Sequence, residues 1–229
     1  VSMFGNGDLP PGDRDPFALR RHALGVIRML SEGNLDLPLD GLLTVAGQVF
    51  ATVDGFKSAE SALADFIYDR LAGSLREQGY TAQEVDAVVS QRPQRLGDIP
   101  KRLAAVRTFA ALPEAAALAA ANKRVGNILK KVEDSVDAWV DTALLKEAAE
   151  VALHAALVDV VPQADAAFIT GDYTESLQAL AALRAPVDAF FDDVMVNAED
   201  PALRANRLGL LAKLHLAMNQ VADISKLSA

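Results

Sequence analysis

The apolar residues of this chain recur every three or four positions over most of its length, which is the spacing of one buried face of an α-helix. Gly, Pro and short polar runs interrupt this pattern and mark where one helix ends and the next begins. The predicted helices cover residues 15–33, 39–52, 58–78, 81–90, 113–131, 143–160, 174–194 and 201–226, with an Ala-rich segment between Pro100 and Phe109. No stretch alternates apolar and polar residues as a half-buried strand does. The pattern therefore predicts an all-α fold, a multi-helix bundle preceded by a short linker and a helical junction.

The first predicted helix carries the strongest local signals. Asp15 stands where an N-cap is needed, and Pro16 follows at the first helical position, where its missing N–H is harmless. We expect Asp15 to cap this helix and Phe17, Leu24 and Ile27 to be buried. These residues would make the segment part of the bundle rather than a loose linker.

Other helix ends are marked as clearly. Gly79 is suited to end the helix that starts near residue 58. Thr81 and Glu84 have the spacing of a capping box, in which each side chain satisfies the backbone N–H of the other. Pro186 lies inside a predicted helix and should kink or split it.

Composition and the first residue add further constraints. The chain has 229 residues, 51% hydrophobic and 23% charged, which fits one or two domains with a real core. It has no Cys, which excludes disulfides, thiolate zinc sites, iron–sulfur clusters and cysteine nucleophiles, and suits a reducing cytosol. The apolar stretch 151–161 is interrupted by His154 and Asp159, so we expect a soluble protein without a bilayer-crossing segment. Because Val1 is not an initiator Met, we expect a piece of a longer polypeptide.

Charge is distributed unevenly along the chain, whose formal net charge is −9. Residues 92–131 carry 9 Lys+Arg and 2 Asp+Glu, net +7, whereas residues 132–200 carry 2 and 15, net −13. Such a basic segment can attract phosphate within an acidic protein, because the Debye length at physiological salt is only about 8 Å. Alternatively, these are solvated helix faces paired with the acidic segments. Composition leaves both interpretations open.

Candidate catalytic residues are scarce. His22, His154 and His215 lie far apart, and none has a zinc-motif partner. The turn at 5–7 lacks the Lys-Ser/Thr of a phosphate-binding loop and is more typical of a linker. No nucleophile with a nearby base can be named. We therefore expect no catalytic residue, cofactor or metal in this chain.

Several spaced blocks stand out along the chain. In chain order they are DPFALRR at 15–21, ALGVIR at 23–28, RP at 92–93, AANKRV at 120–125, NIL at 127–129, ALRAPVDAFFDDVMV at 182–196, RANRL at 204–208 and ADIS at 222–225. Together these blocks resemble the C-terminal portion of the bacterial glycyl-tRNA synthetase β subunit. The first block departs from the bare Asp-Ala-Leu-Arg pattern because Pro16 and Phe17 are inserted into it. The match extends over nearly the whole chain, from about Phe4 to Leu227.

The resemblance implies an all-α anticodon-binding domain of the DALR type. On this basis residues 1–14 would be a linker from the preceding domain, 15–91 a helical junction, and 92–229 the C-terminal part of the anticodon-binding bundle. Synthetases of this family are α₂β₂ assemblies or fused chains, located in the cytoplasm. Their α part makes glycyl-adenylate from glycine, ATP and Mg²⁺, while the β part recognises tRNA(Gly). The resemblance implies tRNA, the α subunit and the rest of β as partners, and neither DNA nor a membrane.

The resemblance also turns the basic segment into a set of candidate tRNA contacts. Lys and Arg would hold phosphates, and Asn amides can both donate to and accept from a base edge. The candidates are Arg92, Arg95, Lys101, Arg102, Arg107, Asn122, Lys123, Arg124, Asn127, Lys130 and Lys131. Arg124 could instead cross-link helices. The alternative function is a helical assembly module that uses its acidic face and contacts no RNA.

Overall fold

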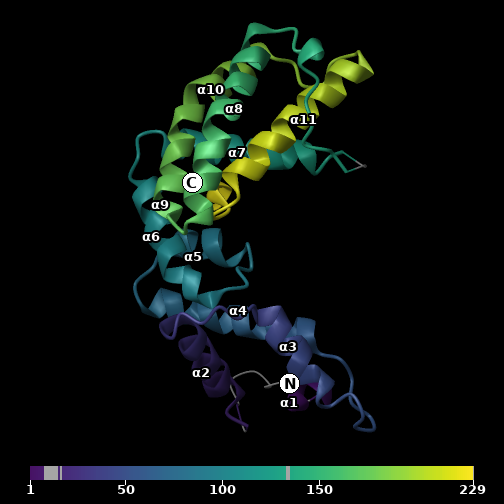
Figure 1. Cartoon of the computed structure of the whole chain (residues 1–229), viewed down its shortest axis with the longest axis vertical. Helices are drawn as coiled ribbons and strands as arrows, with labels where there is room; N and C mark the ends of the chain where they lie inside the picture. The colour runs from purple at the N-terminus through teal and green to yellow at the C-terminus, as the bar shows by residue number, and fades with distance from the viewer. Residues whose placement is uncertain (8–14, 16, 133–134, 229) are drawn as a thin grey trace. The chain divides into compact units, whose positions relative to one another are not determined.

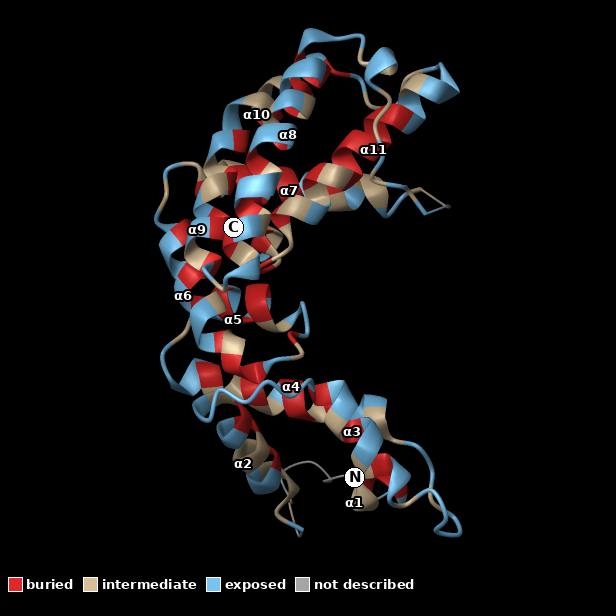
Figure 2. Ribbon diagram, viewed as in Figure 1, coloured by how far each residue is buried: buried red, intermediate tan, exposed pale blue. Residues whose placement is uncertain are grey.

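The computed structural model describes residues 1–7, 15, 17–132 and 135–228, and within these ranges every regular element is helical (Figure 1). This confirms the all-α prediction. The chain divides into two compact units, Val1–Pro100 and Lys101–Ala229, each with its own buried core (Figure 2). The division falls within the helix Ile99–Ala110 rather than at the expected 91/92 boundary.

The first unit is organised around its longest helix. Its elements are α1 (Ser2–Gly5), α2 (Leu19–Glu32), α3 (Leu39–Gln48), α4 (Glu60–Glu77), α5 (Ala82–Val89) and the 3₁₀ turn η1 (Leu96–Asp98). Helix α4 packs against α2, α3 and α5, and it contributes Ile67 and Leu71 to the core. Residues between α5 and η1 belong to this unit because the backbone N–H of Leu39 donates to the carbonyl of Gln94 (3.0 Å).

The second unit contains the remaining elements. These are α6 (Ile99–Ala110, beginning at the end of the first unit), α7 (Ala115–Leu129), η2 (Thr142–Leu144), α8 (Ala148–Ile169), α9 (Tyr173–Ala179), η3 (Leu180–Leu183), α10 (Arg184–Asp193), α11 (Pro201–Met218) and η4 (Ile224–Leu227). Helix α8 packs against α9, α10 and α11, while α7 packs against α10, α11 and η4. The break at η3 confirms that Pro186 splits the predicted helix 174–194, since Pro cannot donate to the preceding turn.

Helix α2 begins later than predicted. Ala18 has a left-handed backbone (φ 53°), so the helix starts at Leu19, and Phe17 ahead of it lies in a turn. Asp15 still caps the helix from that turn: its carboxylate accepts from the N–H of Leu19 (2.7 Å) and of Arg20 (3.0 Å). The prediction that Phe17 is buried is wrong, because Phe17 lies ahead of the helix and is 52% exposed. Of the other two predicted core residues, Ile27 is buried and Leu24 half-buried.

The expected linker at residues 1–14 is also corrected in part. Ser2–Gly5 forms the short helix α1, and Phe4 is buried with its ring 5.3 Å from that of Phe66. Residues 8–14 and Pro16 lie outside the described residues. The capping box of Thr81 and Glu84 is confirmed, with both reciprocal hydrogen bonds present.

Helix α8 begins and ends later than the predicted helix 143–160. Its 22 residues run through Pro162, which is exposed, so the carbonyl that loses its donor can meet water. By length and average hydropathy α8 could cross a bilayer, although charged and polar residues interrupt its apolar run. In this fold Leu153 and Leu157 are fully buried, so one face of α8 packs against neighbouring helices.

A buried ion pair fixes the N-terminus of α8 to α11. The Glu150 carboxylate is fully buried and accepts from Arg207 Nε (2.8 Å) and from the N–H groups of Lys146 and Glu147. Burial alone would raise the pKa of Glu150, but these hydrogen bonds outweigh it and hold the pKa below its ordinary value. Arg207 also donates to the carbonyl of Met195 (2.7 Å), which ties the end of α10 to the same point.

Candidate nucleic-acid interface

The exposed side of α7 gathers most of the candidate contacts. Buried Leu118 and Val125 hold the opposite side of the helix in the core. Lys123, Asn127 and Lys130 follow one another at helical spacing and are exposed. We call the exposed residues Lys123, Arg124, Asn127, Lys130 and Lys131 the α7 basic edge. It places four cations and one amide on a single helix end.

Arg124 is held in place by the neighbouring helix. Its guanidinium lies 4.1 Å from the ring centroid of Phe191 on α10. A cation–π contact of this kind limits the rotamers of the side chain while its charge stays at the surface. Arg124 therefore links α7 to α10, as one interpretation of the sequence suggested. It also adds a charge of fixed position to the α7 basic edge.

His215 adjoins this edge and was not among the predicted contacts. A Cβ at Gly126 would lie 3.5 Å from His215 Nε2, so the imidazole packs on α7 where no side chain intervenes. Burial lowers the pKa of His215 and the charge of Lys130 lowers it further, against an opposing effect of Asp223. The imidazole is thus neutral at pH 7 and can donate or accept a hydrogen bond. This position could not be predicted from the sequence, because the register of α11 against α7 is set by tertiary packing.

Asn122 was predicted to read a base, but in the structure it has a structural role. Its side chain is 1% exposed. Its amide donates to Asn219 Oδ1 (2.9 Å), and the Asn219 amide donates back to Asn122 Oδ1 (3.0 Å). The donor and acceptor that would read a base are used to join α7 to the end of α11.

Arg102 is also structural. Its Nη1 donates to the carbonyls of Gln220 (3.2 Å) and Val221 (2.6 Å), and its guanidinium lies 4.8 Å from the ring centroid of Tyr173. These contacts anchor the residues after α11 to α6 and α9. These interactions commit Nη1 and the ring-facing side of the guanidinium to the fold.

Arg92 and Arg95 lie in the first unit, and both are ion-paired there. Arg92 pairs with Asp65 and stacks over the ring of Tyr68, whereas Arg95 pairs with Asp36 (3.0 Å). The ion pair with Asp65 raises the pKa of Arg92, and burial raises that of Tyr68 to about 12. The basic segment of the sequence is therefore divided between two units and partly neutralised.

The last two candidates, Lys101 and Arg107, are exposed on α6 in the second unit. Among the described residues, no three His, Asp or Glu side chains gather closely enough to hold a metal ion. The sequence predicted contacts on this helix, α7, but it could not separate the exposed cations of α7 from its buried amide.

Two family models match the chain. Residues 118–228 match the family described as "DALR anticodon binding domain", and residues 1–90 match the family described as "Glycyl-tRNA synthetase beta subunit". The helical fold and the first match define the class of the second unit, a DALR-type anticodon-binding domain. The α7 basic edge lies within this matched region.

Curated relatives then identify the family. The chain is 86% identical over its full length to the glycine–tRNA ligase β subunit of Dechloromonas aromatica (strain RCB), and 70% identical to that of Polaromonas naphthalenivorans (strain CJ2). It is 69% identical to that of Janthinobacterium sp. (strain Marseille). The chain belongs to the glycyl-tRNA synthetase β-subunit family, as its sequence blocks indicated. It spans about a third (32%) of the length of these relatives.

Proposed function

We propose that the second unit binds the anticodon stem-loop of tRNA(Gly) through the α7 basic edge. The observation that carries this proposal is an exposed row of cations, Lys123, Arg124, Lys130 and Lys131, inside a domain of the anticodon-binding class. The whole chain is acidic, so without such a row its net charge of −9 would repel RNA. Phosphate contacts supply most of the affinity of such an interface but carry no sequence information.

We expect the uncharged groups of the same edge to recognise bases. Asn127 is exposed between Lys123 and Lys130, and its amide can pair with the hydrogen-bonding edge of an unstacked loop base. Neutral His215 packs at Gly126, the residue before Asn127, and offers a second polar group. In this arrangement the cations position the loop and Asn127 discriminates between loop sequences.

The parent enzyme would use this contact for positioning. In a glycine–tRNA ligase the α subunit would form glycyl-adenylate from glycine and ATP with Mg²⁺, in the cytoplasm. Holding the anticodon end of a bound tRNA fixes where the acceptor end lies, which converts recognition into productive orientation. The contribution of this chain to aminoacylation is then tRNA selection without its own chemistry.

The proposal is tested by tRNA binding to the complete α/β enzyme. Lys123→Gln and Lys130→Gln should each weaken binding of tRNA(Gly) and of a non-cognate tRNA by the same factor, because phosphates are common to both. Asn127→Ala should cost about 1–3 kcal/mol for tRNA(Gly) alone, a magnitude taken from base contacts in DNA grooves. Lys57→Gln, an equal change of charge at an exposed residue of the first unit, is the matched control.

Two results would contradict the proposal. Unchanged affinity in both Lys variants would remove the α7 basic edge from the tRNA interface. A loss in Asn127→Ala that is equal for cognate and non-cognate tRNA would show that this amide does not discriminate bases. Circular dichroism of each variant confirms that the fold is retained.

A further inference from the structure

Arg124 and Phe191 form a stack of two side chains at the surface of the second unit. The guanidinium of Arg124, on α7, lies over the Phe191 ring of α10, 4.1 Å from its centroid. Phe191 is half-buried, and its ring meets that of fully buried Phe190 edge to face, with centroids 5.6 Å apart. The core therefore supports the Phe191 ring, and this ring supports the guanidinium.

The opposite side of this guanidinium is open. Arg124 is exposed, and within the described part of the chain its guanidinium makes no ion pair and no hydrogen bond. Arg92 and Arg102 also lie over aromatic rings, but Arg92 is paired with Asp65 and Arg102 donates to two backbone carbonyls. The Arg124 guanidinium is a planar cation with one side on a ring, so its other side is left for a ligand with a flat face.

The chemistry of this open side suits an unpaired nucleobase. Bases that are splayed out of an RNA loop stack on aromatic rings or on Arg guanidinium planes, and every base has a face that can do so. Exposed Asn127 follows Arg124 by three positions, so the two side chains leave neighbouring points of one helix surface, with about 5–6 Å between Cβ atoms. A base stacked on Arg124 would therefore have its edge within reach of the Asn127 amide.

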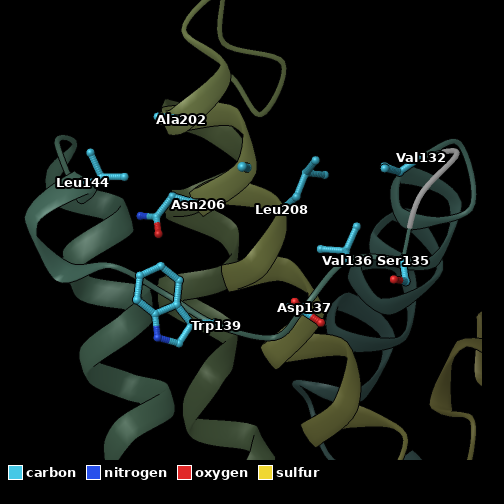
Figure 3. A pocket seen from close by; sticks show the side chains of 10 residues that line it. Val132, Ser135, Val136, Asp137, Trp139, Leu144, Ala202, Asn206 and Leu208 are labelled. Carbon is cyan, nitrogen blue, oxygen red and sulfur yellow. The ribbon is translucent and has the colours of Figure 1, made fainter.

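Trp139 is a second exposed side chain on which a base could stack. It is 70% exposed beside a mainly apolar groove of about 550 Å³ next to α11 (Figure 3). Among the described residues that line this groove Asp137 alone is charged, and Asp141 follows on the same segment. These carboxylates repel the phosphates that accompany every base, whereas Arg124 lies among the cations of the α7 basic edge. Charge thus favours Arg124 over Trp139.

We propose that the Arg124–Phe191 stack is the base-stacking site of the α7 basic edge, and that one unpaired base of the anticodon loop lies on the Arg124 guanidinium with its edge at Asn127. The proposal rests on the proposed function, because it requires that this edge binds an RNA loop. Arg124 holds a base through its plane, while Lys123 and Lys130 hold phosphates through their charge. Phe191 is a positioning residue that keeps the guanidinium plane in place.

Abasic substitutions in tRNA(Gly) test the proposal with the complete α/β enzyme. One unpaired nucleotide of the anticodon loop at a time loses its base and keeps its phosphate. At one position this loss should weaken binding to the natural sequence about 5- to 100-fold, which is the usual range for one stacked base. In Arg124→Lys, which keeps the charge and removes the plane, the same loss should have a clearly smaller effect. The salt dependence of binding should be unchanged in this variant, because its charge is unchanged.

Variants at Phe191 test the support beneath the guanidinium. Phe191→Leu removes the ring and should reduce the dependence of binding on the same base, whereas Phe191→Tyr keeps the ring and should retain it. Unchanged base dependence in Phe191→Leu would overturn the positioning role of Phe191. Arg28→Lys, the same substitution at an exposed arginine that pairs with Glu32 in the first unit, is the matched control. Thermal denaturation confirms that each variant folds.

The outcomes separate this proposal from the proposed function. Equal base dependence in the natural sequence and in Arg124→Lys at every loop position would overturn the stacking site, as would a base dependence that Trp139→Leu removes. If Lys123→Gln and Lys130→Gln weaken tRNA binding in that case, the edge holds phosphates and only the stacking proposal is wrong. If none of these variants changes tRNA binding, both proposals are overturned.

Discussion

Two buried polar pairs set the register of the helices in the second unit. Asn122 and Asn219 exchange two hydrogen bonds between α7 and the end of α11, and Glu150 and Arg207 join α8 to α11. In a low-dielectric interior such pairs are costly when one partner is lost, so they select one packing arrangement over its neighbours. The α7 basic edge depends on the first pair for its orientation.

Asn122→Ala should therefore act on stability and not on the choice of tRNA. The substitution leaves Asn219 Oδ1 without its partner and should lower the free energy of unfolding by about 1–3 kcal/mol. Replacing both Asn residues by Ala should cost less than the sum of the two single changes, which urea denaturation can measure. Loss of tRNA selectivity without loss of stability would restore Asn122 as a base-reading residue.

Glu150→Gln should reveal the ion pair through its pH dependence. The folded pKa of Glu150 is lower than its unfolded value of about 4.5, so the stabilisation is complete above that pH and is lost as pH falls through the folded pKa. At neutral pH the variant should lose up to about 3–5 kcal/mol, because buried Arg207 loses its closest partner and keeps only the longer ion pair with Glu147 (3.9 Å). The difference between the two proteins should shrink in urea denaturation near pH 3. A difference independent of pH would contradict this account.

At the scale of elements, local signals in the sequence identify most helices, and tertiary contacts decide how they begin and end. The capping box at Thr81 was predictable because both partners lie within one helical turn. The start of α2 was not, because it depends on the left-handed conformation of Ala18, a residue type that rarely adopts it. The continuation of α8 past Pro162 was missed for a related reason, since an exposed Pro leaves its unpaired carbonyl to solvent.

Asp15→Ala and Phe17→Ala separate capping from burial at α2. The first variant removes the acceptor for the N–H groups of Leu19 and Arg20 and should cost about 0.5–2 kcal/mol. The second should cost less than about 1 kcal/mol, because Phe17 is half exposed and lies outside the core. Thermal and urea denaturation of the two variants measure both values. A larger loss for Phe17→Ala than for Asp15→Ala would show that the turn before α2 is packed.

At the scale of the whole molecule, the sequence identified a basic segment, but it could not show which of the charges in that segment are paired in the fold. Arg92, which follows α5, is paired with Asp65 of α4, and Arg102 donates to backbone carbonyls more than a hundred residues away. Such partners cannot be identified from a count of charges along the sequence. In the second unit the α7 basic edge stays exposed, as do Lys101 and Arg107 on α6.

The salt dependence of tRNA binding tests the central claim most directly. The affinity of the complete α/β enzyme for tRNA(Gly) would be measured over a salt series for the natural sequence, for the double variant Lys123→Gln/Lys130→Gln, and for Lys57→Gln. If both lysines of the α7 basic edge contact phosphates, the slope of log K against log salt should fall in magnitude by about 1.4–1.8 in the double variant, at roughly 0.7–0.9 per contact. It should be unchanged in Lys57→Gln. An unaltered slope and affinity in the double variant would contradict the account.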